Sequence, residues 1–104
     1  TDIFMSRAMD DSLRGLAFAN RCNRSEIIQR AIKEYTYPAK KEQLAALKNE
    51  KNIPDADNHV WRTLHLSSSD YEKIRGFAHK EGISRGVILR DMLQKHIDKN
   101  PRTP

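Results

Sequence analysis

The central part of the chain carries the clearest strand pattern. Residues 60–66, Val-Trp-Arg-Thr-Leu-His-Leu, are rich in β-branched, aromatic and aliphatic side chains and end at the serine run 67–69. Side chains alternate along a strand. One face would carry Arg62, Leu64 and Leu66, and the other Trp61, Thr63 and His65. We expect the leucine face to pack on a core, with Arg62 extending to solvent, and the other face to meet a partner.

This strand needs a second strand and supporting helices, because a lone two-stranded ribbon is marginal in water. Residues 3–5 supply a candidate, which would place Ile3 and Met5 inward. Its outward positions would be Asp2, Phe4 and Ser6. The alternative, a strand at residues 5–9 with Phe4, Ser6 and Ala8 outward, would bury Arg7 at a higher cost. We favour the first register, which leaves Arg7 just beyond the ribbon.

Helical periodicity accounts for most of the remaining chain. The predicted helices are 8–20, 24–37, 39–51, 70–81 and 85–99. Their predicted N-caps are Asn23 (with Glu26 in a capping box), Ser69 (with Glu72) and Ser84. Gly82 is placed to end the fourth helix, and Asn100-Pro101 to end the last.

Two segments repeat at an offset of 61 residues. Arg14-Gly15-Leu16-Ala17 aligns with Arg75-Gly76-Phe77-Ala78, and Asn23-Arg24 aligns with Ser84-Arg85. We therefore divide the chain into a first unit at 1–38, a partly helical linker at 39–59 and a second unit at 60–100. Each unit reads strand, helix, turn, helix, and neither could bury its helices alone. The predicted fold is mainly α with a two-stranded antiparallel β-ribbon, the units forming one intertwined domain with pseudo-twofold symmetry.

Composition narrows the range of functions. The 104 residues carry a net charge of +5, and residues 59–104 hold 9 basic against 5 acidic side chains, which suits a polyanionic partner. A single cysteine, Cys22, favours a reducing, cytoplasmic location. No apolar run is long enough to span a membrane, and no signal-peptide pattern is present. The chain begins with Thr1 rather than methionine, so we expect residues upstream.

Catalytic and metal-binding patterns are absent from the sequence. The serines at 67–69 have no histidine or acid spaced to activate them, and the four histidines and Cys22 lack metal-ligand spacing. No phosphate-binding glycine loop or zinc-protease motif occurs. We expect no enzyme, no cofactor and no small-molecule substrate.

The order of elements resembles the ribbon-helix-helix family, the Arc/MetJ/CopG type of DNA-binding protein. The residues that carry the resemblance are Thr63-Leu64-His65-Leu66, Gly82-Ile83-Ser84-Arg85, Val87-Ile88-Leu89 and the first-unit stretch 23–30. The resemblance covers about three quarters of the chain. The family normally forms homodimers, so this chain is similar to a tandem, single-chain form, as in accessory DNA-binding proteins of conjugative transfer.

The resemblance implies that the ribbon enters the major groove of double-stranded DNA and that helix N-termini hold phosphates. The base-contacting residues carried over are Trp61, Thr63, His65, Phe4 and Ser6. The phosphate-contacting residues carried over are Arg7, Arg24, Ser25, Ser84 and Arg85. The alternative to DNA contact is that these residues form an ordinary solvent-exposed surface. Trp61 has two further readings, packing on sugar-phosphate or covering the ribbon edge.

Two roles fit this DNA-binding activity: a repressor-like transcriptional regulator, and an accessory protein that marks or bends DNA for a conjugative relaxase. Further copies of the chain along DNA, or a relaxase-type protein, would then be partners. The alternative of another class is a protein–protein interaction module on the same fold. The helix at 39–51 serves as a bridge between the units, or its lysines (Lys40, Lys41, Lys48 and Lys51) touch flanking phosphate. Because the first strand matches the family poorly, we expect a non-palindromic site read mainly by the second strand.

Overall fold

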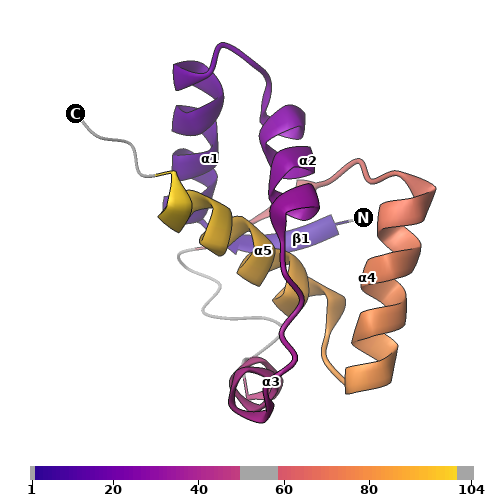
Figure 1. Ribbon diagram of the computed structural model, residues 1–104. Helices are drawn as coiled ribbons and strands as arrows, with labels where there is room; N and C mark the ends of the chain where they lie inside the picture. The colour runs from indigo at the N-terminus through magenta and orange to yellow at the C-terminus, as the bar shows by residue number, and fades with distance from the viewer. Residues whose placement is uncertain (1, 50–58, 101–104) are drawn as a thin grey trace.

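The computed structural model describes residues 2–49 and 59–100, which form a mainly helical protein with one two-stranded antiparallel sheet (Figure 1). The elements in chain order are β1 (Asp2–Ser6), α1 (Arg7–Ala19), α2 (Arg24–Glu34), α3 (Lys41–Lys48), β2 (His59–Thr63), α4 (Ser68–Glu81) and α5 (Arg85–Lys99). The predicted fold class is confirmed at this level. The sheet joins the beginning of the chain to its second half, so the two predicted units share one core.

The ribbon pairs β1 with β2 in a register that places Phe4 opposite Trp61 and Asp2 opposite Thr63. Ile3 and Met5 are each only 1% exposed, which confirms the favoured register of the first strand. The alternative register is wrong, because residues from Arg7 onward are helical. The predicted extension of the second strand to residue 66 is also wrong: β2 ends at Thr63, where its partner Asp2 is the first described residue of β1.

Side-chain caps fix where the helices begin. The Ser6 hydroxyl accepts a hydrogen bond from the Met9 N–H at 3.0 Å, and the Asn23 side chain accepts one from the Glu26 N–H at 2.9 Å. The second of these confirms Asn23 as an N-cap. The Ser69 cap is wrong. Ser67 has the extended backbone of an N-cap and accepts from the Asp70 N–H at 3.1 Å, so Ser69 lies inside the first turn of α4.

Among the described helices α5 has the most buried residues, and the predicted apolar stripes form the core around it. In Figure 1 it crosses β1, and both β1 and the helices α1, α2 and α4 contact it. Its buried apolar residues are Val87, Ile88, Leu89, Met92 and Leu93. A helix that is apolar over so wide an arc needs neighbours on several sides. The ribbon and the helices α1, α2 and α4 supply them.

Polar contacts join α2 to α5 near the end of α2. The Tyr35 hydroxyl donates a hydrogen bond to the Asp91 carboxylate at 2.6 Å. Burial raises the pKa of Tyr35, and the adjacent Asp91 carboxylate raises it further. His96, buried on α5, contacts Glu34 through Nδ1 at 2.9 Å. These contacts tie the second helix of the first unit to the second helix of the second unit.

The chain from the end of α2 through α3 packs against the core. Helix α3 is shorter than the predicted 39–51, although residues 50–51 lie outside the described chain, and it buries Leu47. Ahead of it, the Tyr37 ring packs against Tyr35 at 5.2 Å and against Phe77 of α4 at 4.8 Å between ring centroids. Burial, and then the charge of Asp70, raises the pKa of Tyr37. The chain after α2 therefore fastens α4 to the core.

Substitution of Gly82 tests the left-handed turn that ends α4, and Gly76 inside the same helix is the control. Gly82 has a φ of +65°, whereas Gly76 lies inside α4, and a Cβ at either position would meet no atom within 4 Å. We expect Gly82→Ala to lower the free energy of unfolding by about 1 kcal/mol, because L-residues are strained in the left-handed region. Gly76→Ala should raise it by about 0.5–1 kcal/mol. Urea denaturation of both variants measures this, and equal effects would contradict the assignment.

Candidate nucleic-acid interface

The outer face of the ribbon brings together residues from both ends of the chain. Alternation along the paired strands places Asp2, Phe4, Ser6, Trp61 and Thr63 on this face. Ile3 and Met5 on the opposite face are buried in the core. The face contains one large exposed aromatic side chain, Trp61, which is 58% exposed. The structure therefore assembles four of the five predicted base-contacting residues on one small surface.

Phe4 and Trp61 stack on each other across the two strands. Their ring centroids are 4.8 Å apart and their planes differ by 9°. Phe4 is only 7% exposed, so little of its ring is left for a base edge. The predicted direct base contact by Phe4 is therefore disfavoured by this geometry. Phe4 instead supports the Trp61 indole from below.

The polar groups beside this stack already have partners. The Thr63 hydroxyl donates to the Asp2 carboxylate at 2.7 Å, which ties the two strands together at their end. The Ser6 hydroxyl accepts from the Met9 N–H at the start of α1. A hydroxyl has one proton to donate and two lone pairs. Thr63 can therefore still accept a hydrogen bond, and Ser6 can still donate one.

His65 lies outside the paired ribbon, two residues beyond the end of β2. The alternation of the strand nevertheless continues through this segment, since Leu64 is buried and His65 is exposed. Leu66 is partly buried against the core. The imidazole is thus open to solvent. Unlike Trp61 and Thr63, His65 is not paired with β1.

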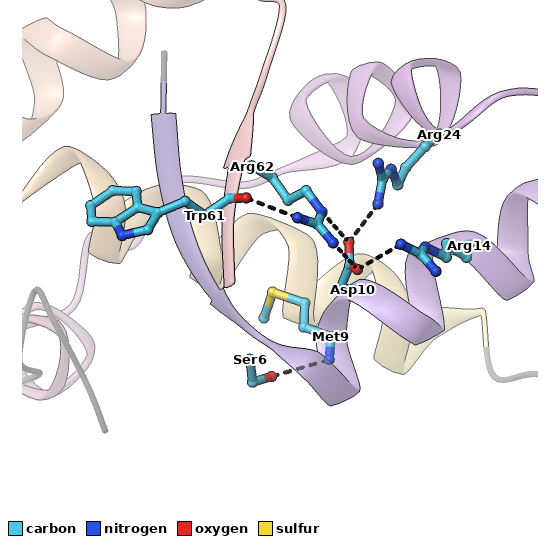
Figure 2. Close-up of polar contacts among 7 residues, drawn as sticks. All are labelled: Ser6, Met9, Asp10, Arg14, Arg24, Trp61 and Arg62. Carbon is cyan, nitrogen blue, oxygen red and sulfur yellow. Dashed lines mark hydrogen bonds and ion pairs between the residues drawn. The ribbon is translucent and has the colours of Figure 1, made fainter. Parts of the chain in front are cut away.

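A buried carboxylate behind the ribbon is the main feature that sequence reasoning missed. Asp10 on α1 is 4% exposed and is surrounded by three arginines (Figure 2). Its oxygens lie 2.5 Å from Arg24, 3.0 Å from Arg62 and 3.5 Å from Arg14. The Arg62 Nε also donates to it at 3.2 Å. Arg62 was expected to extend to solvent, but it turns inward because this carboxylate needs a partner.

A signal for this cluster was present in the sequence. Asp10 is three residues before Leu13 and next to Met9, so it falls on the apolar side of α1. A carboxylate in such a position must be paired, because an isolated buried charge is very costly. The identity of its partners was not visible, since Arg24 and Arg62 are distant along the chain.

The predicted phosphate-contacting residues lie at three helix starts. Arg7 is the exposed first residue of α1, and Ser25 is exposed in the first turn of α2. Arg24, also at the start of α2, is engaged by Asp10 and about a third exposed. The structure does not gather these residues into one cluster.

The start of α5 carries the other two. Ser84 is its N-cap residue, and Arg85 is exposed in its first turn. The Arg85 guanidinium donates to the Tyr71 hydroxyl and lies 5.5 Å from the centroid of that ring. Arg85 is therefore held by an uncharged partner, and its positive charge is not neutralised by this contact, unlike that of Arg24.

Comparison of the chain with protein-family models, with curated proteins and with solved structures finds no match. Among the described residues, no group of three or more histidine, cysteine, aspartate or glutamate side chains is placed to hold a metal ion. None of the described helices combines the length and the apolar character needed to cross a membrane.

The Asp10 cluster can be tested by an isosteric substitution. Asp10→Asn removes the charge that three arginines share and leaves Arg24 and Arg62 without their anionic partner. We expect the free energy of unfolding to fall by about 3 kcal/mol, as when a buried ion pair loses one member. The control is Asp11→Asn, an exposed neighbour that should change stability by less than about 0.5 kcal/mol. Equal losses in urea denaturation would contradict a structural role for Asp10.

Proposed function

We propose that this chain is a single-chain tandem ribbon-helix-helix protein that binds double-stranded DNA by inserting its β-ribbon into the major groove. The observation that carries the proposal is the paired ribbon. It presents Trp61 and Thr63 outward, and each of its two strands leads into a helix. The proposed role is that of a repressor-like regulator that covers a promoter. The role of accessory protein in conjugative DNA transfer requires the same DNA-binding surface.

The helix starts support the tandem arrangement. Helices α1 and α4 begin at Arg7 and Ser68, which are 61 residues apart, and α2 and α5 begin at Arg24 and Arg85, also 61 apart. The caps repeat in the same way. Ser6 and Ser67 each accept a hydrogen bond from the N–H three residues later. The 61-residue spacing found in the sequence thus recurs at these helix starts, whereas β1 and β2 begin at Asp2 and His59, which are 57 residues apart.

A side-chain contact recurs at the same offset. In the first unit Arg24 pairs with Asp10, and in the second unit Arg85 contacts Tyr71, each pair separated by 14 residues. Corresponding positions therefore make corresponding contacts, although the acid of the first unit is a tyrosine in the second. Divergence of this kind is expected of a fused pair, and it fits a DNA site whose two halves differ.

The two-stranded antiparallel form of the ribbon fits the proposed mode of binding. The major groove of B-DNA admits a two-stranded β-ribbon, and base edges are read there by outward side chains. The starts of α2 and α5 supply backbone N–H groups that have no acceptor within their own helix and the positive end of a helix dipole, both of which suit phosphates. The basic excess of residues 59–104 lies in the unit that contributes β2, the better candidate for readout.

A protein–protein module remains the candidate of another class, and one observation favours it. Phe18, near the end of α1, is 87% exposed, which is unusual for a large apolar side chain. Salt dependence separates the two functions. Phosphate contacts release counterions, so the affinity for DNA falls steeply as salt rises, whereas an apolar protein interface responds weakly.

The first test is selection from a random duplex pool. We expect the native chain to enrich one motif, non-palindromic because the two strands present different side chains. The Thr63→Ala/His65→Ala double variant should lose that enrichment while it remains folded by circular dichroism. Failure of the native chain to enrich any sequence would contradict sequence-specific DNA binding.

The second test concerns the start of α5. Arg85→Ala should weaken DNA binding for all sequences alike and reduce the slope of log K against log salt by about 1, because one phosphate contact is lost. The matched control is Arg30→Ala, an exposed arginine in the interior of α2. Binding titrations at several salt concentrations measure both. Equal slopes for the native chain and Arg85→Ala would refute the phosphate contact.

A further inference from the structure

The Trp61 indole is the best-placed free recognition group on the outer face of the ribbon. Its neighbours are engaged: Thr63 donates its proton to Asp2, and Phe4 is covered. The indole is 58% exposed, and its N–H makes no hydrogen bond within residues 2–49 and 59–100. An apolar ring with one free donor therefore stands at the centre of the surface.

We infer that Trp61 determines base specificity and that the base it selects is thymine, an inference that rests on the proposed DNA-binding function. In the major groove thymine presents a C5-methyl group beside the O4 acceptor. Indole presents an apolar surface beside a single N–H donor. The methyl group packs against the ring, and O4 accepts from the indole N–H.

The other three bases match the indole less well. Cytosine presents an amino donor, which opposes the indole donor, and has no methyl group. Adenine and guanine offer acceptors but no apolar group in the major groove. Thymine is the one base that offers both a methyl group for the apolar ring and an acceptor beside it for the indole N–H.

The stack on Phe4 makes this recognition more selective. With centroids 4.8 Å apart and nearly parallel planes, Phe4 holds the indole in one orientation across the ribbon. In Figure 2 the Trp61 ring extends across β1, on the side of the strand away from the Asp10 cluster. A side chain that is ordered before binding loses less conformational freedom when it meets the base.

The experiment replaces single thymines by uracil in the duplex that selection returns. Uracil differs from thymine only by the missing methyl group. At one position we expect the native chain to bind the uracil duplex about fourfold more weakly, the effect of one buried methyl group. Trp61→Ala should bind both duplexes equally. Phe18→Ala, which removes the other exposed aromatic ring at the far end of α1, should retain the fourfold difference.

Intrinsic fluorescence gives a second measurement that needs no variant. Trp61 is the only tryptophan of the chain, so its emission reports on this residue alone. Saturation with the selected duplex should change the emission and protect it from acrylamide quenching. Unchanged emission and unchanged quenching would overturn the inference even if Trp61→Ala failed to fold.

The results separate this inference from the proposed function. A chain that enriches no motif fails as a sequence-specific DNA-binding protein, and the inference fails with it. A chain that enriches a motif without thymine, or that tolerates uracil at every position, still binds DNA but does not read thymine through Trp61. A uracil penalty that persists in Trp61→Ala would assign the methyl contact to another residue.

Discussion

The carboxylate of Asp10 holds together three segments that are far apart in the sequence. It lies on α1, receives Arg24 from the start of α2 and receives Arg62 from β2. A buried charge is tolerated only when it is paired and hydrogen-bonded, so the carboxylate constrains the positions of both arginines. The inward turn of Arg62 leaves Trp61, the preceding residue of β2, on the opposite face. The outer face of the ribbon and the ion-pair cluster therefore lie on opposite sides of the same strand.

The core gives this arrangement its rigidity. Arg90, buried on α5, donates to the Phe4 carbonyl at 3.0 Å, so the central helix contacts the backbone of β1 directly. Phe4 in turn stacks beneath Trp61. The polar contacts of Tyr35 and His96 join the C-terminal end of α2 to the same helix, α5. The ribbon is thus held by helices through specific hydrogen bonds as well as by apolar packing, which a lone two-stranded sheet would lack.

The outer face has an unusual balance of chemical groups for a surface proposed to read DNA. Its hydroxyls and its carboxylate form hydrogen bonds within the protein, and its large exposed side chain, that of Trp61, is aromatic. Recognition on such a face would use shape and methyl contacts more than networks of hydrogen bonds. The two units would contribute unequally, because β1 supplies the support at Phe4 and β2 supplies the contact at Trp61.

The sequence alone determined the features that depend on neighbouring residues. Apolar spacing located the helices, Asn23 marked a cap, Gly82 marked a left-handed turn, and the burial of Ile3 and Met5 followed from alternation. These features are local, because capping, helix periodicity and strand alternation act over a few residues. One local prediction was wrong: Ser69 was predicted to cap α4, but Ser67 does. The serines at 67–69 all offer the same hydroxyl, and the backbone conformation of Ser67 makes it the cap.

Only the tertiary structure decided the features that depend on distant partners. The end of β2 at Thr63 follows from the position of β1, the partnership of Arg24 and Arg62 follows from Asp10, and the stack of Phe4 on Trp61 follows from the strand register. Each of these joins residues at least 14 positions apart. A sequence pattern states that a buried charge or an aromatic ring needs a neighbour, but the neighbour is chosen only when the chain folds.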